Sequence, residues 1–372
     1  MRKLKGAFGV GLPAAALFVL FTCAHCSIND VASTPPEAGG AGGEPSDTTP
    51  GGAPNQTDGG TGNPMGGTPG TDAGTGGALL TGGAGGEASV PVSGDHYGYV
   101  IDSLTMPASA NQAMQVAFDL DGDDLVDNAL GQAMATFASQ GFDVNGAIKT
   151  AILDGDTILL GDLQATAFTD AEGAAFATYF GTDPVPAACA AAADCGKHLT
   201  GLGSFTLAAS PAGKACEGRI EAHAFSCQGG SLPIRFSIGA TVDVTLRDAR
   251  VELSDVVKAG IPSGRLGGSI SEKDVNDHIY PAIHTAVAGA LTQDCPGGAA
   301  PGCGCTASST GATYVALFDT NHDCAVPLSE LKENALFTSL LSPDLDLDHD
   351  DTPESLSCAF TISAKSATFE LP

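Results

Sequence analysis

The chain of 372 residues has no tryptophan and few basic residues, and each shortage excludes a class of function. Its 15 Lys and Arg stand against 43 Asp and Glu, which gives a formal charge of −28. Because phosphate binding needs a cationic surface, this balance excludes nucleic acid as a partner. The absence of tryptophan argues against a sugar-stacking groove and against an interface anchored by a large aromatic side chain.

Enzyme motifs are also missing. The sequence contains no Gly-x-Ser-x-Gly elbow, no His-Glu-x-x-His pair and no phosphate-cradling loop. We therefore do not expect an enzyme, although two alternatives stay open: an exported hydrolase, and a surface adhesin or ligand-binding β-domain. A hydrolase would show convergent carboxylates or a Ser/His pair in a deep cleft, and an adhesin would show a large apolar cavity or patch.

Residues 1–22 have the pattern of an export signal. Three basic residues, Arg2, Lys3 and Lys5, precede a largely apolar run over residues 6–21. That run is short for a membrane span, and a single transmembrane anchor is the alternative interpretation. The segment that ends at Cys23, Leu20-Phe21-Thr22-Cys23, resembles the lipidation box of bacterial lipoproteins. The resemblance implies that a lipidated Cys23 attaches the chain to a membrane.

Either route of signal removal would export the rest of the chain. Lipidation would give an outer-membrane or cell-surface lipoprotein. Ordinary cleavage near Ala24 or Cys26 would give a periplasmic or secreted protein instead.

Residues 23–94 are expected to form a disordered tether. Between residues 35 and 94 the chain has 20 Gly and 8 Pro and almost nothing large to bury. Behind a lipid anchor, such a coil would hold a folded domain clear of the membrane surface. A neutral low-complexity insert is the alternative.

Residues 95–372 are expected to form one folded domain of the α+β class. Apolar and polar residues alternate over 219–224, 234–238 and 242–253, which predicts antiparallel strands with one solvated face. The alternation slips by one residue near Arg247-Asp248, where we expect a bulge. Helical spacing predicts helices over 110–118, 127–139, 143–153, from Ser271 onward, and on both sides of a loop within 312–341. The predicted architecture is an antiparallel β-sandwich or barrel-like sheet, with helical segments and acidic loops at both ends.

Eleven cysteines in an exported chain predict disulfides. Cys189–Cys195 and Cys216–Cys227 are the expected local pairs, and Cys358 is expected to stay free. Two further disulfides are expected among Cys295, Cys303, Cys305 and Cys324. A zinc site that combines the Cys303-Gly304-Cys305 segment with His322 or Cys324 is the alternative, although structural zinc prefers a two-residue gap between paired cysteines.

The strongest site signal lies within the last predicted helical pair. The segment reads Asp319-Thr320-Asn321-His322-Asp323-Cys324-Ala325-Val326-Pro327-Leu328-Ser329-Glu330. It resembles the twelve-residue calcium loop of the EF-hand family, with oxygen side chains at positions one, three, five and twelve and an apolar residue at position eight. The resemblance implies Ca²⁺ as the bound ion. It implies as ligands Asp319, Asn321, Asp323, the backbone oxygen of Ala325, and Glu330.

This segment departs from the family pattern at two positions. Cys324 stands at position six, where the family has glycine in a sharp turn with positive φ. A side chain there costs about 1–2 kcal/mol, and a disulfide from Cys324 could hold the turn. Pro327 at position nine offers no side-chain ligand, so a water molecule would take that place.

A second acidic segment, residues 119–127, matches the calcium pattern in part. It resembles an EF-hand-type loop or the acidic loops of dockerin and thrombospondin repeats. Gly122 stands at position four instead of six, and Leu130 stands where a terminal acid is expected. The alternative is a solvated acidic turn in which Asp127 caps the next helix. The ligands implied by the resemblance are Asp119, Asp121, Asp123, the backbone oxygen of Leu125, and Asp127.

A third acidic run, residues 344–351, is predicted to be a solvated loop because it has neither a glycine turn nor a placed glutamate.

A sensor function is not expected, because sensing exposes a Met-rich groove and residues 313–341 contain no methionine. The sequence therefore predicts an exported, lipid-anchored protein in which Ca²⁺ stabilises the folded domain.

Overall fold

The computed structural model describes residues 90–191, 194–295 and 310–371. The predicted signal, the tether up to residue 89, and the cysteines Cys303 and Cys305 lie outside the described residues. The first strand begins at Asp95, where the sequence predicted that folding begins. Within the described segments, no helix combines the length and the apolar character needed to cross a membrane.

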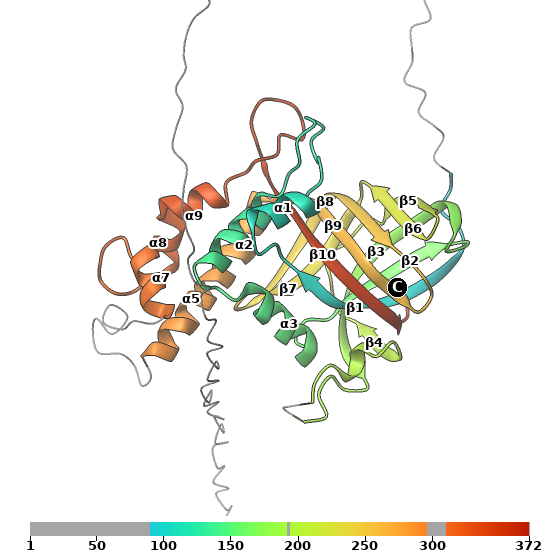
Figure 1. The fold of residues 1–372 in the computed structure, drawn as a ribbon, viewed down its shortest axis with the longest axis horizontal. Coiled ribbons are helices and arrows are strands. Elements are labelled where there is room, and N and C mark those ends of the chain that lie inside the picture. Colours follow the sequence, from blue (N-terminus) through green and yellow to red (C-terminus); the bar gives the residue numbers. More distant parts are fainter. Residues whose placement is uncertain (1–89, 192–193, 296–309, 372) are drawn as a thin grey trace, which may run out of the picture. The chain divides into compact units, whose positions relative to one another are not determined.

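A closed barrel of antiparallel strands forms the centre of the domain (Figure 1). The pairing runs β1–β2–β3–β5–β6–β8–β9–β10, and β10 pairs back with β1, so eight strands close a ring. Outside the ring, β7 pairs with β8, and β4 joins β3 and β10. The barrel-like sheet of the sequence prediction is thus confirmed, and the sandwich is wrong. The strands are β1 (Asp95–Thr105), β2 (Leu159–Ala165), β3 (Asp170–Val185), β4 (Gly203–Leu207), β5 (Cys216–Glu221), β6 (Ala224–Gln228), β7 (Ser231–Ser237), β8 (Thr241–Ser254), β9 (Gly260–Ser271) and β10 (Ser355–Thr368).

Strand β8 shows how the alternating sequence builds this barrel. Its apolar residues from Val242 to Leu253 are buried and alternate with polar ones on the other face. The predicted slip is present, because the register with β9 shifts between Arg247 and Arg250, and Asp248 has a φ of 48°. The bulge lets both halves of the strand keep their apolar residues inside.

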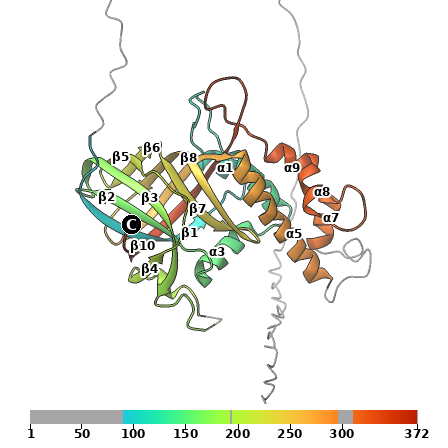
Figure 2. The ribbon, with the colours of Figure 1, turned by 180° about the vertical axis from the view of Figure 1, so that it is seen from behind.

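The helices gather at one side of the barrel in both views (Figures 1 and 2). Ser271 caps the helical segment after β9 as predicted, since its hydroxyl accepts from the Asp274 amide. Asn128 rather than Asp127 caps α2. Asn334 separates α8 from α9 and caps α9, so the helix after the 319–330 loop is not continuous up to residue 341. The helical segments are α1 (Ala110–Val116), α2 (Ala129–Ser139), α3 (Val144–Asp154), η1 (Lys197–Leu199), α4 (Glu272–Asp274), η2 (Val275–Ile279), α5 (Tyr280–Asp294), α7 (Thr310–Phe318), α8 (Leu328–Glu333) and α9 (Ala335–Leu340).

An aromatic cluster joins α7 and α9 to the rest of the domain. Phe337 stacks on Phe137 of α2 with ring centroids 4.8 Å apart and meets Phe318 edge-on at 4.7 Å. Phe142, which follows α2, stacks on Tyr314 of α7 at 3.8 Å. These rings pack α7, which precedes the 319–330 loop, and α9, which follows α8, against α2 and Phe142. The position of the loop therefore depends on packing between distant parts of the chain.

The predicted local disulfides, Cys189–Cys195 and Cys216–Cys227, are confirmed. Cys358 is free and buried in β10, also as predicted. Cys295 and Cys324 are both disulfide-bonded. A bonded sulfur cannot act as a thiolate ligand, so the zinc alternative loses Cys324.

Candidate metal centre

The 319–330 loop connects α7 to α8 and turns sharply at its centre. His322 and Cys324 both have positive φ, at 61° and 67°. The sharp turn expected at position six is therefore present, with a cysteine where the EF-hand pattern has glycine. Since Cys324 is also disulfide-bonded, a covalent link accompanies the unfavourable backbone conformation.

Backbone amides of the loop hold three of the predicted ligands in place. Asp319 is 5% exposed, and its carboxylate accepts from the amides of Asp323 at 3.2 Å and of Cys324 at 2.7 Å. The Asn321 side-chain oxygen accepts from the Asp323 amide at 2.8 Å, and the Asp323 carboxylate accepts from the Ala325 amide at 2.9 Å. Each of these oxygens accepts from one amide and keeps an electron pair for a cation.

Glu330 closes the loop from α8. One carboxylate oxygen from each of Asp319, Asp323 and Glu330 lies within 4.8 Å of the other two. Glu330 is 6% exposed, and its Oε1 accepts from the Thr320 amide, the Thr320 hydroxyl and the Asn321 amide at 2.6–2.8 Å. Its Oε2 is buried and has no hydrogen-bond partner. A buried carboxylate oxygen without a partner is costly, and a cation between the three carboxylates would satisfy it.

Buried apolar side chains lie within the same loop and on the helices beside it. Val326, at position eight, is 5% exposed, as the EF-hand pattern implies. Phe318 and Leu331, on the incoming and outgoing helices, are also buried. One side of the loop is therefore shielded from water, and the lower dielectric constant there strengthens the electrostatic attraction to an ion.

The 119–127 loop brings together Asp119, Asp121 and Asp127, with one oxygen from each within 4.8 Å of the others. Asp123 is outside this group, and its carboxylate accepts from the Leu125 amide at 2.8 Å. Burial, followed by the neighbouring charges of Asp121, Asp344 and Asp123, raises the pKa of Asp127 to about 6, against the effect of a hydrogen bond from the Leu120 amide.

The second loop also differs from the first in its apolar support. Val126, at position eight, is 47% exposed, whereas Val326 at the same position of the first loop is buried. The backbone nevertheless follows the same course. Gly122 and Asp124 at positions four and six have positive φ of 85° and 69°, like His322 and Cys324.

The third acidic run converges in a way that the sequence prediction missed. Oxygens of Asp346, Asp348 and Glu354 lie within 4.8 Å of one another. His349 and Asp351, at positions four and six, have positive φ of 59° and 67°. The signal was the spacing one, three and nine, which equals that of Asp119, Asp121 and Asp127. Asp348 and Glu354 are exposed, so the solvated loop of the prediction holds for them.

The second and third acidic loops pack against each other (Figures 1 and 2). Leu120 and Leu345 are buried together with Phe118 and Ala359 in a small apolar cluster. The Asp344 carboxylate accepts from the Ser357 amide and hydroxyl at 2.7 and 2.5 Å. Burial is the main cause that raises the pKa of Asp344, and the charge of Asp121 adds to it. Negative charge is thus concentrated where these two loops meet.

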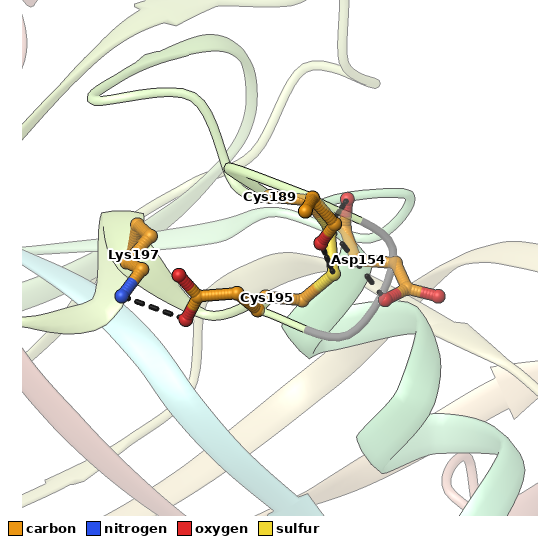
Figure 3. The surroundings of a disulfide bond; sticks show 6 residues. Asp154, Cys189, Cys195 and Lys197 are labelled. Atoms are coloured by element: carbon orange, nitrogen blue, oxygen red, sulfur yellow. Dashed lines mark hydrogen bonds and ion pairs between the residues drawn. A yellow bond between two sulfur atoms is a disulfide. The ribbon is translucent and has the colours of Figure 1, made fainter.

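Another grouping of potential ligands, Asp154 with Cys189 and Cys195, is not a metal site (Figure 3). The two sulfurs are bonded to each other at 2.06 Å, so neither is available as a thiolate. Asp194 and Lys197 beside them form an ion pair at 2.7 Å. This region is a cross-linked loop over the end of α3.

Comparisons with protein-family models, curated proteins and solved structures gave no match. The alternative of a ligand-binding β-domain gains no support from the barrel interior, where Phe176, Phe225 and Phe360 are at most 1% exposed. Of the described acidic groups, the 319–330 group is the one that contains a buried carboxylate oxygen without a partner.

Proposed function

We propose that this protein is an exported calcium-binding protein in which Ca²⁺, held by the 319–330 loop, stabilises the folded domain. The observation that carries the proposal is the buried, unpartnered Oε2 of Glu330, in a carboxylate that has one oxygen within 4.8 Å of oxygens of Asp319 and Asp323. The ligands are Asp319, Asn321, Asp323, the backbone oxygen of Ala325, and Glu330. All are oxygens, the donors that Ca²⁺ prefers.

The ion removes an electrostatic cost that the fold otherwise bears. Asp319, Asp323 and Glu330 bring three negative charges close together, and Asp319 and Glu330 are nearly out of reach of water. Like charges at such distances repel strongly where the dielectric constant is low. A divalent cation between the three carboxylates replaces this repulsion with attraction. It also links the end of α7 to α8.

We propose a structural rather than a sensory role for this ion. Phe318, which directly precedes the loop, and Phe337 are already buried and in ring contact, and Phe337 also stacks on Phe137. A sensor exposes an apolar groove when it binds the ion. Here that groove would have to form by breaking the aromatic cluster.

The 119–127 loop is proposed as a second, weaker calcium site. Its ligands are Asp119, Asp121, Asp123, the backbone oxygen of Leu125, and Asp127. The convergence of three carboxylates supports this, since one oxygen from each of Asp119, Asp121 and Asp127 lies within 4.8 Å of the others. Extracellular calcium modules function with dissociation constants of about 10⁻⁴–10⁻³ M, so a partial ligand set suffices.

Calorimetric titration of the full chain with Ca²⁺ tests the principal site. We expect binding with a dissociation constant of about 10⁻⁴–10⁻³ M or tighter, and loss of that binding event in Glu330→Gln. The amide keeps the size of the side chain but removes the charge. Glu333→Gln, one turn further along α8, is the matched control and should bind as the wild type does. Heat of binding that persists unchanged in Glu330→Gln would contradict the proposal.

We further propose that lipidation of Cys23 anchors the exported chain to a membrane. The proposal rests on the basic and apolar pattern of residues 1–22 and on the lipoprotein-like box. The disulfides Cys189–Cys195 and Cys216–Cys227, together with the disulfide-bonded Cys295 and Cys324, agree with an oxidising compartment. Metabolic labelling with a fatty acid should mark the wild-type chain and not Cys23→Ser. An unlabelled wild-type chain would favour ordinary cleavage instead.

A further inference from the structure

We propose that Glu330 binds the metal ion through Oε2 alone, which makes the 319–330 loop a six-oxygen site that accepts Mg²⁺ as well as Ca²⁺. This inference rests on the proposed function, because it specifies the coordination and the ion selectivity of the same site. It departs from the expectation carried by the EF-hand resemblance, in which the glutamate at position twelve supplies two oxygens.

The two carboxylate oxygens of Glu330 have opposite surroundings. Oε1 accepts from the Thr320 amide at 2.6 Å, the Thr320 hydroxyl at 2.7 Å and the Asn321 amide at 2.8 Å. Three donors fully use the electron pairs that a carboxylate oxygen offers. Oε2 has no donor at all and is shielded from water. One oxygen is therefore committed to the loop backbone, and the other is left for the ion.

The other predicted ligands do not show this division. The Asp323 oxygen accepts from a single amide, that of Ala325, and the two oxygens of Asp319 accept from one amide each. Each keeps an electron pair for a cation. The hydrogen bonds of Glu330 thus determine how many of its oxygens can bind the ion. Thr320 supplies two of the three donors to Oε1 and is therefore the residue that positions Glu330.

The ligand count follows directly. Asp319, Asn321, Asp323, the Ala325 carbonyl and Glu330 Oε2 supply five protein oxygens. Pro327 at position nine has no ligand atom in its side chain, so one water completes six. Ca²⁺ takes six to eight oxygens at about 2.3–2.6 Å, whereas Mg²⁺ requires six at about 2.0–2.1 Å. Removing the seventh oxygen costs Ca²⁺ a ligand that Mg²⁺ never uses, so the loop discriminates weakly between the two ions.

The test compares Glu330→Asp with the wild type in the full chain, by titrating Ca²⁺ and Mg²⁺ separately. Heats from the other acidic loops are subtracted with Asp319→Ala. If Glu330 gives one oxygen to either ion, the shorter side chain weakens both ions alike. The ratio of the Mg²⁺ to the Ca²⁺ dissociation constant should then stay within about fivefold of the wild-type ratio. If Glu330 gives Ca²⁺ two oxygens, Ca²⁺ loses more than Mg²⁺ and the ratio falls by more than that, which overturns the inference.

A crystal structure of the wild-type chain grown with Ca²⁺ gives a second measurement that does not depend on the variant. One Glu330 oxygen should lie within about 2.3–2.6 Å of the ion, and the other should remain hydrogen-bonded to Thr320. Two oxygens at that distance would refute single-oxygen binding while upholding the proposed calcium site. A wild-type chain that binds neither ion would refute the proposed function itself, so the two failures are distinguishable.

Discussion

Removal of calcium by a chelator is expected to lower the thermal unfolding midpoint of the wild-type protein. At a free concentration ten times the dissociation constant, each bound ion adds about 1.4 kcal/mol by mass action. Two loops would therefore add about 3 kcal/mol, against a total stability of about 5–15 kcal/mol for a domain. Differential scanning calorimetry with Ca²⁺ and with chelator measures the difference.

The variant Asp319→Asn separates the two loops in this experiment. It removes one of the three converging charges while keeping an oxygen that can accept from the Cys324 amide. The shift between calcium and chelator should fall by at least half, because only the weaker 119–127 loop still responds. In chelator the variant should be at least as stable as the wild type, since repulsion among the carboxylates is reduced.

Asp170→Asn provides the matched control, because Asp170 is an exposed acid at the start of β3 and outside every acidic loop. It should show the full wild-type shift. A wild-type midpoint that does not respond to the chelator would reject a structural role for calcium.

The local features of the fold could be predicted from the sequence because they depend on neighbouring residues. Alternating residues in β8 predicted its buried face and its bulge, and Cys189 and Cys195 are close enough in sequence to pair without knowledge of the fold. The closure of the barrel could not be predicted from neighbouring residues. It depends on pairing of β1 with β10, from opposite ends of the domain, and alternation does not specify which strand is the partner.

In the candidate site, too, the features that depend on neighbouring residues could be predicted and those that depend on distant packing could not. Spacing alone brought together Asp319, Asp323 and Glu330, since a tight loop places alternate side chains on one side. The third run was dismissed for lack of glycine, yet His349 and Asp351 adopt positive φ, which Asp and His tolerate better than most residues. The unpartnered oxygen of Glu330 could not be foreseen, because it results from burial by the packed helices.

Truncation of Phe337 to alanine is expected to produce the largest loss of stability among these predictions. Phe337 is fully buried on α9 and contacts rings from three other elements, those of Phe137, Tyr280 and Phe318. Phe→Ala changes in cores cost about 3–5 kcal/mol, because the lost contacts are replaced by a cavity. Urea denaturation in the presence of Ca²⁺ should show a midpoint lowered accordingly.

The same substitution should also weaken calcium binding, since the ring of Phe337 meets that of Phe318, and Phe318 directly precedes the ligand Asp319. A loosened Phe318 leaves Asp319 free to move out of the position that the ion requires. Leu336→Ala is the control on the same helix. Leu336 is 40% exposed, and its truncation should cost well under half as much and leave the calcium affinity unchanged. If Phe337→Ala lowered stability but left the affinity at the wild-type value, the loop would hold its ligands without support from the aromatic cluster.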